Sequence, residues 1–255
     1  MKYNYISSLQ GNSGSTVSIV QYLDKLYVLK QGASDFTSHA NIFKALGDLG
    51  LNVPLVHTAN SLHMLMDYIP GRSMYPYLET NGIDDLVAYI SKCFHLFNSI
   101  STPYDFTREL DDKFNELEYR LPPNIKLPFE LHELRSLLPN TMPKGVCHGD
   151  FSLDNILYYQ DKFYLIDSSH KTLNSWWLDA AKITQDINAH WFIRNLNPSV
   201  ELLVKLRELN YQLSQTFDVI NNQYLSCFML LRVLPYCKTV WDQKFIATKL
   251  HSIWT

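Results

Sequence analysis

The sequence predicts an α+β fold in two lobes, a small β-rich N-terminal lobe with one main helix and a larger, mostly helical C-terminal lobe. Two patterns carry this prediction. Strand-like segments dominate residues 1–69, whereas apolar residues recur at helical spacing over much of residues 70–255. The Pro-Gly break in Ile69–Ser73 separates the two patterns. We therefore expect the boundary between the lobes after residue 69.

The N-terminal lobe is expected to begin as an antiparallel meander. Residues 3–9 and 16–23 flank a Gly/Ser turn, and residues 26–30 follow the dipeptide Asp24-Lys25. Short apolar runs separated by turn residues predict paired strands. Two further strands are expected at residues 53–57 and 62–68.

One helix is expected between these strands, over residues 34–50. Ser34 or Asp35 can cap its start, and Gly47 and Gly50 can end it. Its apolar residues fall on one helical face: Phe36, Ala40, Phe43 and Leu46.

The C-terminal lobe is expected to be helical on the same grounds. A Pro-rich connection at residues 121–130 precedes a short helix at residues 129–138, and helical periodicity returns from Ser175 to the end. The clearest helical spacing is that of Ile83, Leu86, Val87, Ile90, Phe94 and Phe97.

Composition bounds the class of protein. The chain has 255 residues, of which 46% are hydrophobic and 18% charged, as expected of a globular protein. A net charge of -3 argues against nucleic acid or an anionic membrane as partner. The sequence contains neither a signal-peptide pattern nor an apolar run that could span a membrane, and its cysteines are scattered: Cys93, Cys147, Cys227 and Cys237. We expect free thiols and a cytoplasmic protein.

Polar residues interrupt the apolar stretch 146–170, which reads VCHGDFSLDNILYYQDKFYLIDSSH. Buried carboxylates are costly unless they are paired or bind a metal, so the stretch indicates a hydrogen-bonded turn or a cation site. As chemistry, it supplies what phosphoryl transfer needs. Asp150 can orient a hydroxyl and accept its proton, and the oxygens of Asn155 and Asp167 suit Mg²⁺ beside nucleotide phosphates.

The spacing His148-x-Asp150-x-x-x-x-Asn155, followed by Ile166-Asp167, resembles the Brenner motif of aminoglycoside phosphotransferases and choline/ethanolamine kinases. These are small-molecule relatives of protein kinases. The resemblance implies a bilobal protein-kinase-like fold, with Asp150 as catalytic base and Asn155 and Asp167 as Mg²⁺ ligands. It also implies structural roles for His148 and for the later Asp179. Asp154 is expected to be an exposed turn residue.

The resemblance extends to the nucleotide site and implies ATP as co-substrate, with GTP not excluded. Lys30 matches the strand lysine that holds the phosphates, and Met66 and Tyr68 lie in the segment that leads to the adenine. The family's phosphate-covering loop corresponds to residues 9–16, with these candidate contacts: Gly11, Ser13, Gly14 and Ser15.

One departure from the family concerns the partner of Lys30. Relatives carry a helix Glu that pairs with this lysine, but the aligned position is His39, and Asp35 is the other candidate. The departure leaves open a catalytically silent kinase fold that binds a nucleotide or a protein partner. Because Asp150, Asn155 and Asp167 are all present, an enzyme is the favoured interpretation.

The acceptor is less determined. Residues 163–191 resemble phosphotransferase-like proteins from bacterial surface-polysaccharide gene sets, which implies a sugar or a sugar-linked alcohol. Choline/ethanolamine or an aminoglycoside is the alternative. His170 either touches the substrate or belongs to a surface loop. Aromatic residues either line a pocket for a quaternary ammonium group or, as we prefer, pack in the core: Tyr158, Tyr159, Trp176, Trp177 and Trp191.

Overall fold

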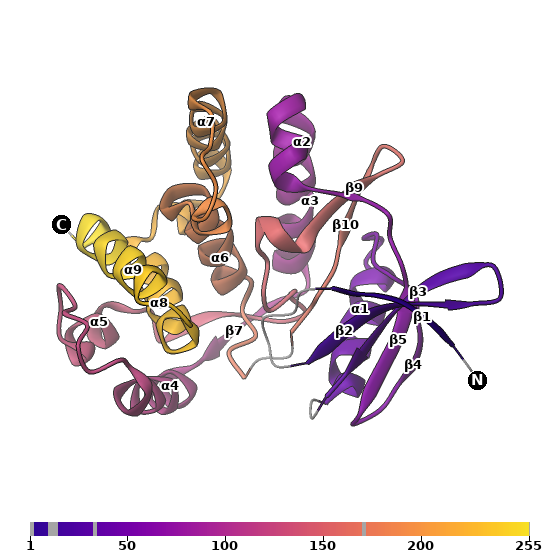
Figure 1. The fold of residues 1–255 in the computed structure, drawn as a ribbon. Coiled ribbons are helices and arrows are strands. Elements are labelled where there is room, and N and C mark those ends of the chain that lie inside the picture. Colours follow the sequence, from indigo (N-terminus) through magenta and orange to yellow (C-terminus); the bar gives the residue numbers. More distant parts are fainter. Residues whose placement is uncertain (1–2, 10–14, 33–34, 170–171, 255) are drawn as a thin grey trace. The chain divides into compact units, whose positions relative to one another are not determined.

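The computed structural model describes residues 3–9, 15–32, 35–169 and 172–254 (Figure 1). The chain divides into two compact units. The sheet unit comprises Met1–Tyr77 and Asp154–His170, and the helical unit comprises Leu78–Leu153 and Lys171–Thr255. An antiparallel sheet near the N-terminus and a helical remainder confirm the predicted α+β class.

The sheet unit is built on a five-stranded antiparallel sheet. The predicted meander of the first three strands is confirmed. The fourth strand begins later than the expected residue 53, and Pro54 explains part of this delay because it has no N–H to donate to the ladder. In spatial order the strands are β1 (Asn4–Leu9), β2 (Thr16–Tyr22), β3 (Lys25–Gln31), β5 (His63–Asp67) and β4 (Val56–Ala59).

Helix α1 (Phe36–Asp48) packs its apolar stripe against this sheet (Figure 1). Of the two proposed capping residues, Asp35 holds the N-cap, where its carboxylate accepts a hydrogen bond from the backbone N–H of Ser38 at 3.4 Å. Ser34 lies outside the described residues. The core between helix and sheet consists of Val28, Phe36, Phe43, Met64 and Met66.

A second, three-stranded sheet brings residues 154–170 into the sheet unit. Gly71 permits the close approach of its chain, since a Cβ atom there would lie 2.9 Å from the Cβ of Leu157. Asn52 fastens the hairpin: its Nδ2 donates to the Phe163 carbonyl at 3.0 Å, and its own carbonyl accepts from the Leu165 N–H at 2.9 Å. The strands, in spatial order, are β10 (Lys162–Leu165), β9 (Ile156–Tyr159) and β6 (Arg72–Ser73).

This division differs from the expected boundary after residue 69. Strand β6 follows that position directly, yet Arg72 pairs with Tyr158 of β9. Residues 70–77 and 154–170 therefore belong with the N-terminal sheet, and α2 (Met74–Thr80) leads the chain out of the unit.

The helical unit confirms the predicted helices. Apolar spacing places Leu86, Ile90 and Phe94 on the buried face of α3, and the short helix after the Pro-rich connection is α5. A two-stranded sheet, β7 (Thr102–Asp105) with β8 (Thr141–Lys144), accompanies the helices. The helices are α3 (Asp84–Ser99), α4 (Thr107–Arg120), α5 (Leu131–Leu137), α6 (Trp176–Ala189), α7 (Val200–Thr216), α8 (Gln223–Val233) and α9 (Val240–Ile253).

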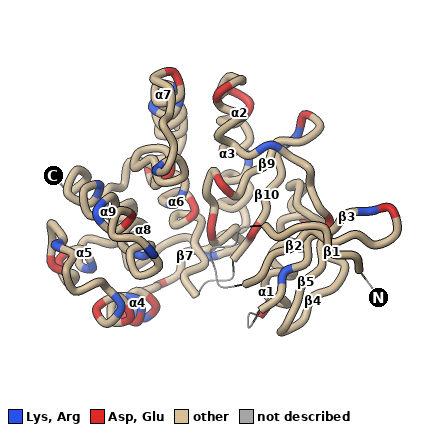
Figure 2. Tube along the Cα trace, viewed as in Figure 1, with Lys and Arg blue, Asp and Glu red and all other residues tan. Residues whose placement is uncertain are grey.

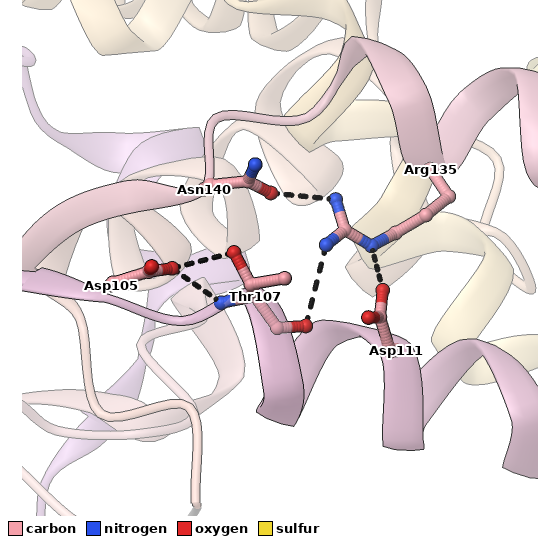
Figure 3. A network of polar contacts seen from close by, with 5 residues as sticks. All are labelled: Asp105, Thr107, Asp111, Arg135 and Asn140. Atoms are coloured by element: carbon pink, nitrogen blue, oxygen red, sulfur yellow. Dashed lines mark hydrogen bonds and ion pairs between the residues drawn. The ribbon is translucent and has the colours of Figure 1, made fainter.

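Charged residues of both signs gather on α4, and one arginine ties this helix to its neighbours (Figures 2 and 3). The guanidinium of Arg135 donates to Asp111 Oδ1 at 2.7 Å, to Asn140 Oδ1 at 2.8 Å and to the Thr107 carbonyl at 3.3 Å. Asp105 accepts from the hydroxyl and the backbone N–H of Thr107, which lower the pKa of its carboxyl. The network fixes the start of α4 against α5.

The proposed aromatic residues pack largely in the two cores. Trp176 contacts Phe94 and Phe217 in the helical unit, with ring centroids 5.7 and 6.0 Å away. Tyr158 packs against Tyr77 and Phe163 in the sheet unit. The side chains of these two residues therefore fit the preferred packing interpretation. Cys93, Cys147, Cys227 and Cys237 are free thiols. In the described ranges, no helix combines the length and the apolar character needed to cross a membrane.

Candidate functional site

Two of the predicted site residues form an ion pair inside the sheet unit. Lys30 lies on β3, Asp167 follows β10, and the ammonium group Nζ of Lys30 contacts Oδ1 of Asp167. The lysine side chain is only 9% exposed, whereas that of Asp167 is 51% exposed. A buried ammonium group needs an anionic partner, and Asp167 supplies it. The structure thus brings together a predicted phosphate ligand and a predicted metal ligand.

The third residue of this group lies at the same end of the β9–β10 hairpin. Ile156 pairs with Leu165 in the ladder, and the carbonyl of Asn155 accepts from the Ile166 N–H at 2.9 Å. Asp167 has a positive φ of 56°, so the chain turns sharply directly after this bond. The hairpin register therefore places Asn155 and Asp167 close together at the open end of the β9–β10 hairpin.

These residues fit a magnesium ion by their chemistry. Their side chains offer a carboxylate and an amide oxygen, both hard ligands, and Asp167 is half exposed. Among the described residues, no three His, Cys, Asp or Glu side chains gather into a metal-binding cluster. A cation at this end of the hairpin would therefore complete its coordination with phosphate and water, as Mg²⁺ does in nucleotide sites.

The predicted base, Asp150, lies in the helical unit. Its carboxylate is 40% exposed, and Oδ1 lies 3.4 Å from Nζ of Lys182 on α6, whose side chain is 12% exposed. Arg232 of α8 is a second neighbouring cation: burial lowers the pKa of its guanidinium, and the negative charge of Asp150 raises it. The carboxylate of Asp150 is thus partly exposed to solvent and is influenced by two cations, Lys182 and Arg232.

Helix α6 holds the loop that carries Asp150. Asp179 accepts from the backbone N–H of His148 at 2.6 Å and of Gly149 at 2.9 Å, and Asp186 accepts from the N–H of Leu153 at 2.7 Å. Burial raises the pKa of Asp179 to about 7, although the hydrogen bonds from the loop lower it. Gly149 has a φ of +80°, which suits glycine. These contacts fit the structural role expected of Asp179.

Sequence reasoning missed Lys182 and Asp186. Both stand on the face of α6 that carries Asp179, because steps of three and seven residues return to the same side of a helix. Three ionisable residues at this spacing, in a helix whose other residues are uncharged, were the available signal.

The proposed nucleotide contacts are described only in part. Gly11, Ser13 and Gly14 lie outside the described residues. Ser15 lies beside Gly32, where a Cβ atom would approach the Ser15 Oγ to 3.2 Å.

The hinge candidates and the proposed substitutes for the helix Glu all make contacts within the sheet unit. The side chain of Met66 is buried in the core between α1 and the sheet, and the N–H of Tyr68 donates to the Leu26 carbonyl at 3.4 Å. Asp35 caps α1, while the His39 carbonyl accepts from the Ser168 hydroxyl at 3.5 Å. The anionic partner of Lys30 is thus Asp167.

A wide hollow in the helical unit, about 730 Å³ in volume, lies along the start of α4. Part of its lining belongs to the Arg135 network of Figure 3, which binds α4 to α5. Lining residues of this hollow therefore help to hold α4 against α5.

An antiparallel sheet with an acid-paired strand lysine, a helix-held loop bearing an aspartate and a hairpin bearing Asn and Asp define the class of kinase-like phosphotransferases. The sequence profile of the phosphotransferase enzyme family matches residues 10–183, which is more than half of the chain. The protein belongs to this family and is a small-molecule phosphotransferase, as the motif predicts. No curated protein shows significant sequence similarity to the chain.

Solved structures share the fold at low sequence identity. A thermostable mutant of an aminoglycoside phosphotransferase, crystallised with ADP and hygromycin B, is 13% identical with a TM-score of 0.65, covering 98% of this chain and 92% of its own. A Plasmodium vivax ethanolamine kinase is 11% identical (TM-score 0.60; 99% and 82% covered). A Haemophilus somnus protein described as a fructosamine-3-kinase is 12% identical (TM-score 0.60; 97% and 92% covered). These similarities confirm the kinase-like fold.

Proposed function

We propose that the protein transfers the γ-phosphate of ATP to a hydroxyl group of a small polar metabolite, either a sugar or a sugar-linked alcohol. The observation that carries the proposal is the pairing of Lys30 with Asp167. The chain lacks the family's helix Glu, yet the strand lysine is buried and held by an acid of the catalytic motif. This arrangement favours a working nucleotide site over a catalytically silent fold.

The roles of the residues follow from their surroundings. Lys30 binds the nucleotide phosphates, and Asn155 and Asp167 hold Mg²⁺, which would neutralise charge on the phosphates when bound. The half-exposed Asp150 accepts the proton of the acceptor hydroxyl. Asp179 and Asp186 act through the backbone of the loop and keep Asp150 in place. Phosphoryl transfer depends mainly on such positioning and on charge neutralisation.

ATP is the proposed co-substrate because a relative of the same fold was crystallised with ADP. We place its phosphates near Lys30 and the loop of Gly11, Ser13, Gly14 and Ser15, and its adenine near the backbone at Met66 and Tyr68. The relatives' acceptors differ, from hygromycin B to ethanolamine and fructosamine, so the fold leaves the choice of acceptor open. A choline/ethanolamine or aminoglycoside kinase is the alternative for this chain.

The test measures ATP consumption with Mg²⁺ against sugars, amino alcohols and aminoglycosides. Asp150→Asn should reduce turnover by about 10²–10⁴-fold and leave nucleotide binding nearly intact, because its side chain serves the acceptor. Asp154→Asn, the same change at an exposed residue four positions further along, is the matched control. Wild-type turnover in the Asp150 variant, or no consumption with any acceptor, would contradict the proposal.

A further inference from the structure

A second cavity in the helical unit has no assigned role. It measures about 180 Å³, a volume that corresponds to roughly six water molecules at ~30 Å³ each. It lies between α6, the 3₁₀ turn Asp218–Asn221, α8 and the end of α9. The residues that line it are Thr184, Gln185, Asn188, Ala189, Ile220, Asn221, Gln223, Ser226, Leu230 and Ile253. We call it the amide pocket.

Gln185 is the residue that distinguishes the amide pocket. The residue is 1% exposed, and neither its side-chain Oε1 nor its Nε2 has a hydrogen-bond partner within the described part of the chain. A buried amide without partners is costly, since it loses its bonds to water and gains none in return. The side chain offers one acceptor and two donor hydrogens to whatever occupies the pocket.

The neighbouring hydroxyl groups are set to accept. The Thr184 hydroxyl donates its proton to the Ala180 carbonyl at 2.9 Å, and the Ser226 hydroxyl donates to the Asn222 carbonyl at 3.2 Å. Each oxygen keeps lone pairs that can accept from an occupant. With Gln185, the buried part of the pocket therefore complements a molecule that both donates and accepts hydrogen bonds.

The lining of the amide pocket is also uncharged. None of its ten lining residues, all within the described ranges, is ionisable. A cationic occupant would therefore lose its hydration without meeting a carboxylate, which is unfavourable. Ala189, Ile220 and Leu230 provide apolar surface for the carbon faces of the occupant. Uncharged hydroxyl groups on a carbon ring satisfy all of these conditions.

The pocket lies on the helix that holds the catalytic loop. In the sequence of α6, Gln185 lies one turn after Lys182, which contacts Asp150, and directly before Asp186, which binds the N–H of Leu153. We propose that the amide pocket binds an uncharged, hydroxyl-rich part of the acceptor, such as a sugar ring, and that Gln185 selects it by donating one hydrogen bond and accepting another. This inference rests on the proposed phosphotransferase function and specifies its substrate.

The experiment compares matched neutral and cationic sugars on the full chain. The panel contains neutral hexoses, heptoses and N-acetylhexosamines, each N-acetylhexosamine being paired with its free amino sugar. Calorimetry with Mg²⁺ and a non-hydrolysable ATP analogue measures binding. We expect at least one neutral sugar to bind, and its amino counterpart, where one exists, to bind at least about tenfold more weakly. Binding by the cationic sugars alone, or by no sugar, would overturn the inference.

Variants test the role of Gln185. Gln185→Met keeps the length of the side chain and removes its hydrogen bonds, so sugar binding should weaken about tenfold or more. The melting temperature without ligand should stay the same or rise, because the wild-type amide is unpaired. Gln215→Met, the same change at an exposed site on α7, should preserve sugar affinity. Unchanged affinity in the Gln185 variant, or a lower melting temperature, would overturn the inference.

Failure of the inference is separable from failure of the proposed function. If a cationic acceptor is phosphorylated in an Asp150-dependent reaction, the kinase proposal stands and the amide pocket assignment falls. If neutral sugars bind through Gln185 but no phosphate is transferred to them, sugar binding by the pocket stands, whereas its assignment to the acceptor falls together with the kinase proposal.

Discussion

The ion pair of Lys30 with Asp167 leads to an asymmetric prediction about stability. Asp167→Ala leaves the ammonium group of a lysine that is 9% exposed without its partner, and breaking a buried pair in this way costs about 3–5 kcal/mol. Lys30→Met leaves a carboxylate that is 51% exposed and can be hydrated, so the cost should be about 1 kcal/mol. The two variants should therefore differ by about 2–4 kcal/mol.

The double variant completes the test. Lys30→Met combined with Asp167→Ala removes both charges, so it should be more stable than Asp167→Ala alone. The control is Lys44→Met, which removes one member of an exposed pair whose side chains are 74% and 66% accessible. This variant should behave almost as the wild-type protein does.

The assay must report on the sheet unit. Every tryptophan lies at position 176 or later, in the helical unit, so tryptophan fluorescence does not monitor β3 directly. Amide hydrogen exchange of β2 and β3, measured without nucleotide or metal, gives the local opening free energy. If Asp167→Ala costs no more than Lys30→Met, or if the double variant recovers nothing, the buried lysine does not depend on Asp167.

Three further predictions concern the acids of the site. The pKa of Asp179 rises from 3.8 to about 7 on folding, so the native state binds this proton more tightly than the unfolded state does. The stability that the protonated carboxyl contributes is therefore full below about pH 4 and is lost as the pH rises to about 7. In thermal melts over this range, Asp179→Asn should lose less stability than the wild-type protein. Asp179→Ala leaves the N–H groups of His148 and Gly149 without their acceptor and should lower the unfolding free energy, measured in urea, by about 2–5 kcal/mol. Nucleotide with Mg²⁺ should raise the melting temperature more than the sum of their separate effects, and Asp167→Ala, unlike Asp154→Ala, should abolish this synergy. The first prediction fails if Asp179→Asn and the wild-type protein lose stability equally with pH, and the second fails if Asp179→Ala unfolds in urea as the wild-type protein does. The third fails if nucleotide raises the melting temperature equally with and without Mg²⁺.

Local patterns predicted most of the elements correctly. Alternating apolar residues around the Asp24-Lys25 turn indicate β2 and β3, and the cap at Asp35 with the Phe36–Phe43 face indicates α1. Such signals lie within one segment and depend on no distant contact. Asp150, Asn155 and Asp167 were proposed in the same way, because their motif lies within one stretch of the sequence.

Contacts between distant segments were not predictable from these patterns. Strand β6 has only two residues, and its pairing with β9 depends on the close approach at Gly71. Sequence reasoning offered Asp35 as the acidic candidate partner of Lys30, whereas the fold supplies Asp167, 137 positions away. Gln185 gave no signal either, since an unpaired amide is visible only once the surrounding helices are in place.

The discontinuous sheet unit has a consequence for biosynthesis. A nascent chain that has emerged only as far as Tyr77 contains the five-stranded sheet, but neither the β9–β10 hairpin nor Asp167. Lys30 then lacks its counter-ion, and Asn52 lacks the hairpin backbone that it binds. The sheet unit therefore stays incomplete during synthesis until residue 170 has left the ribosome. At about 5–20 residues per second, the intervening segment takes several seconds to synthesise, and a chaperone that protects the open sheet would act in that interval.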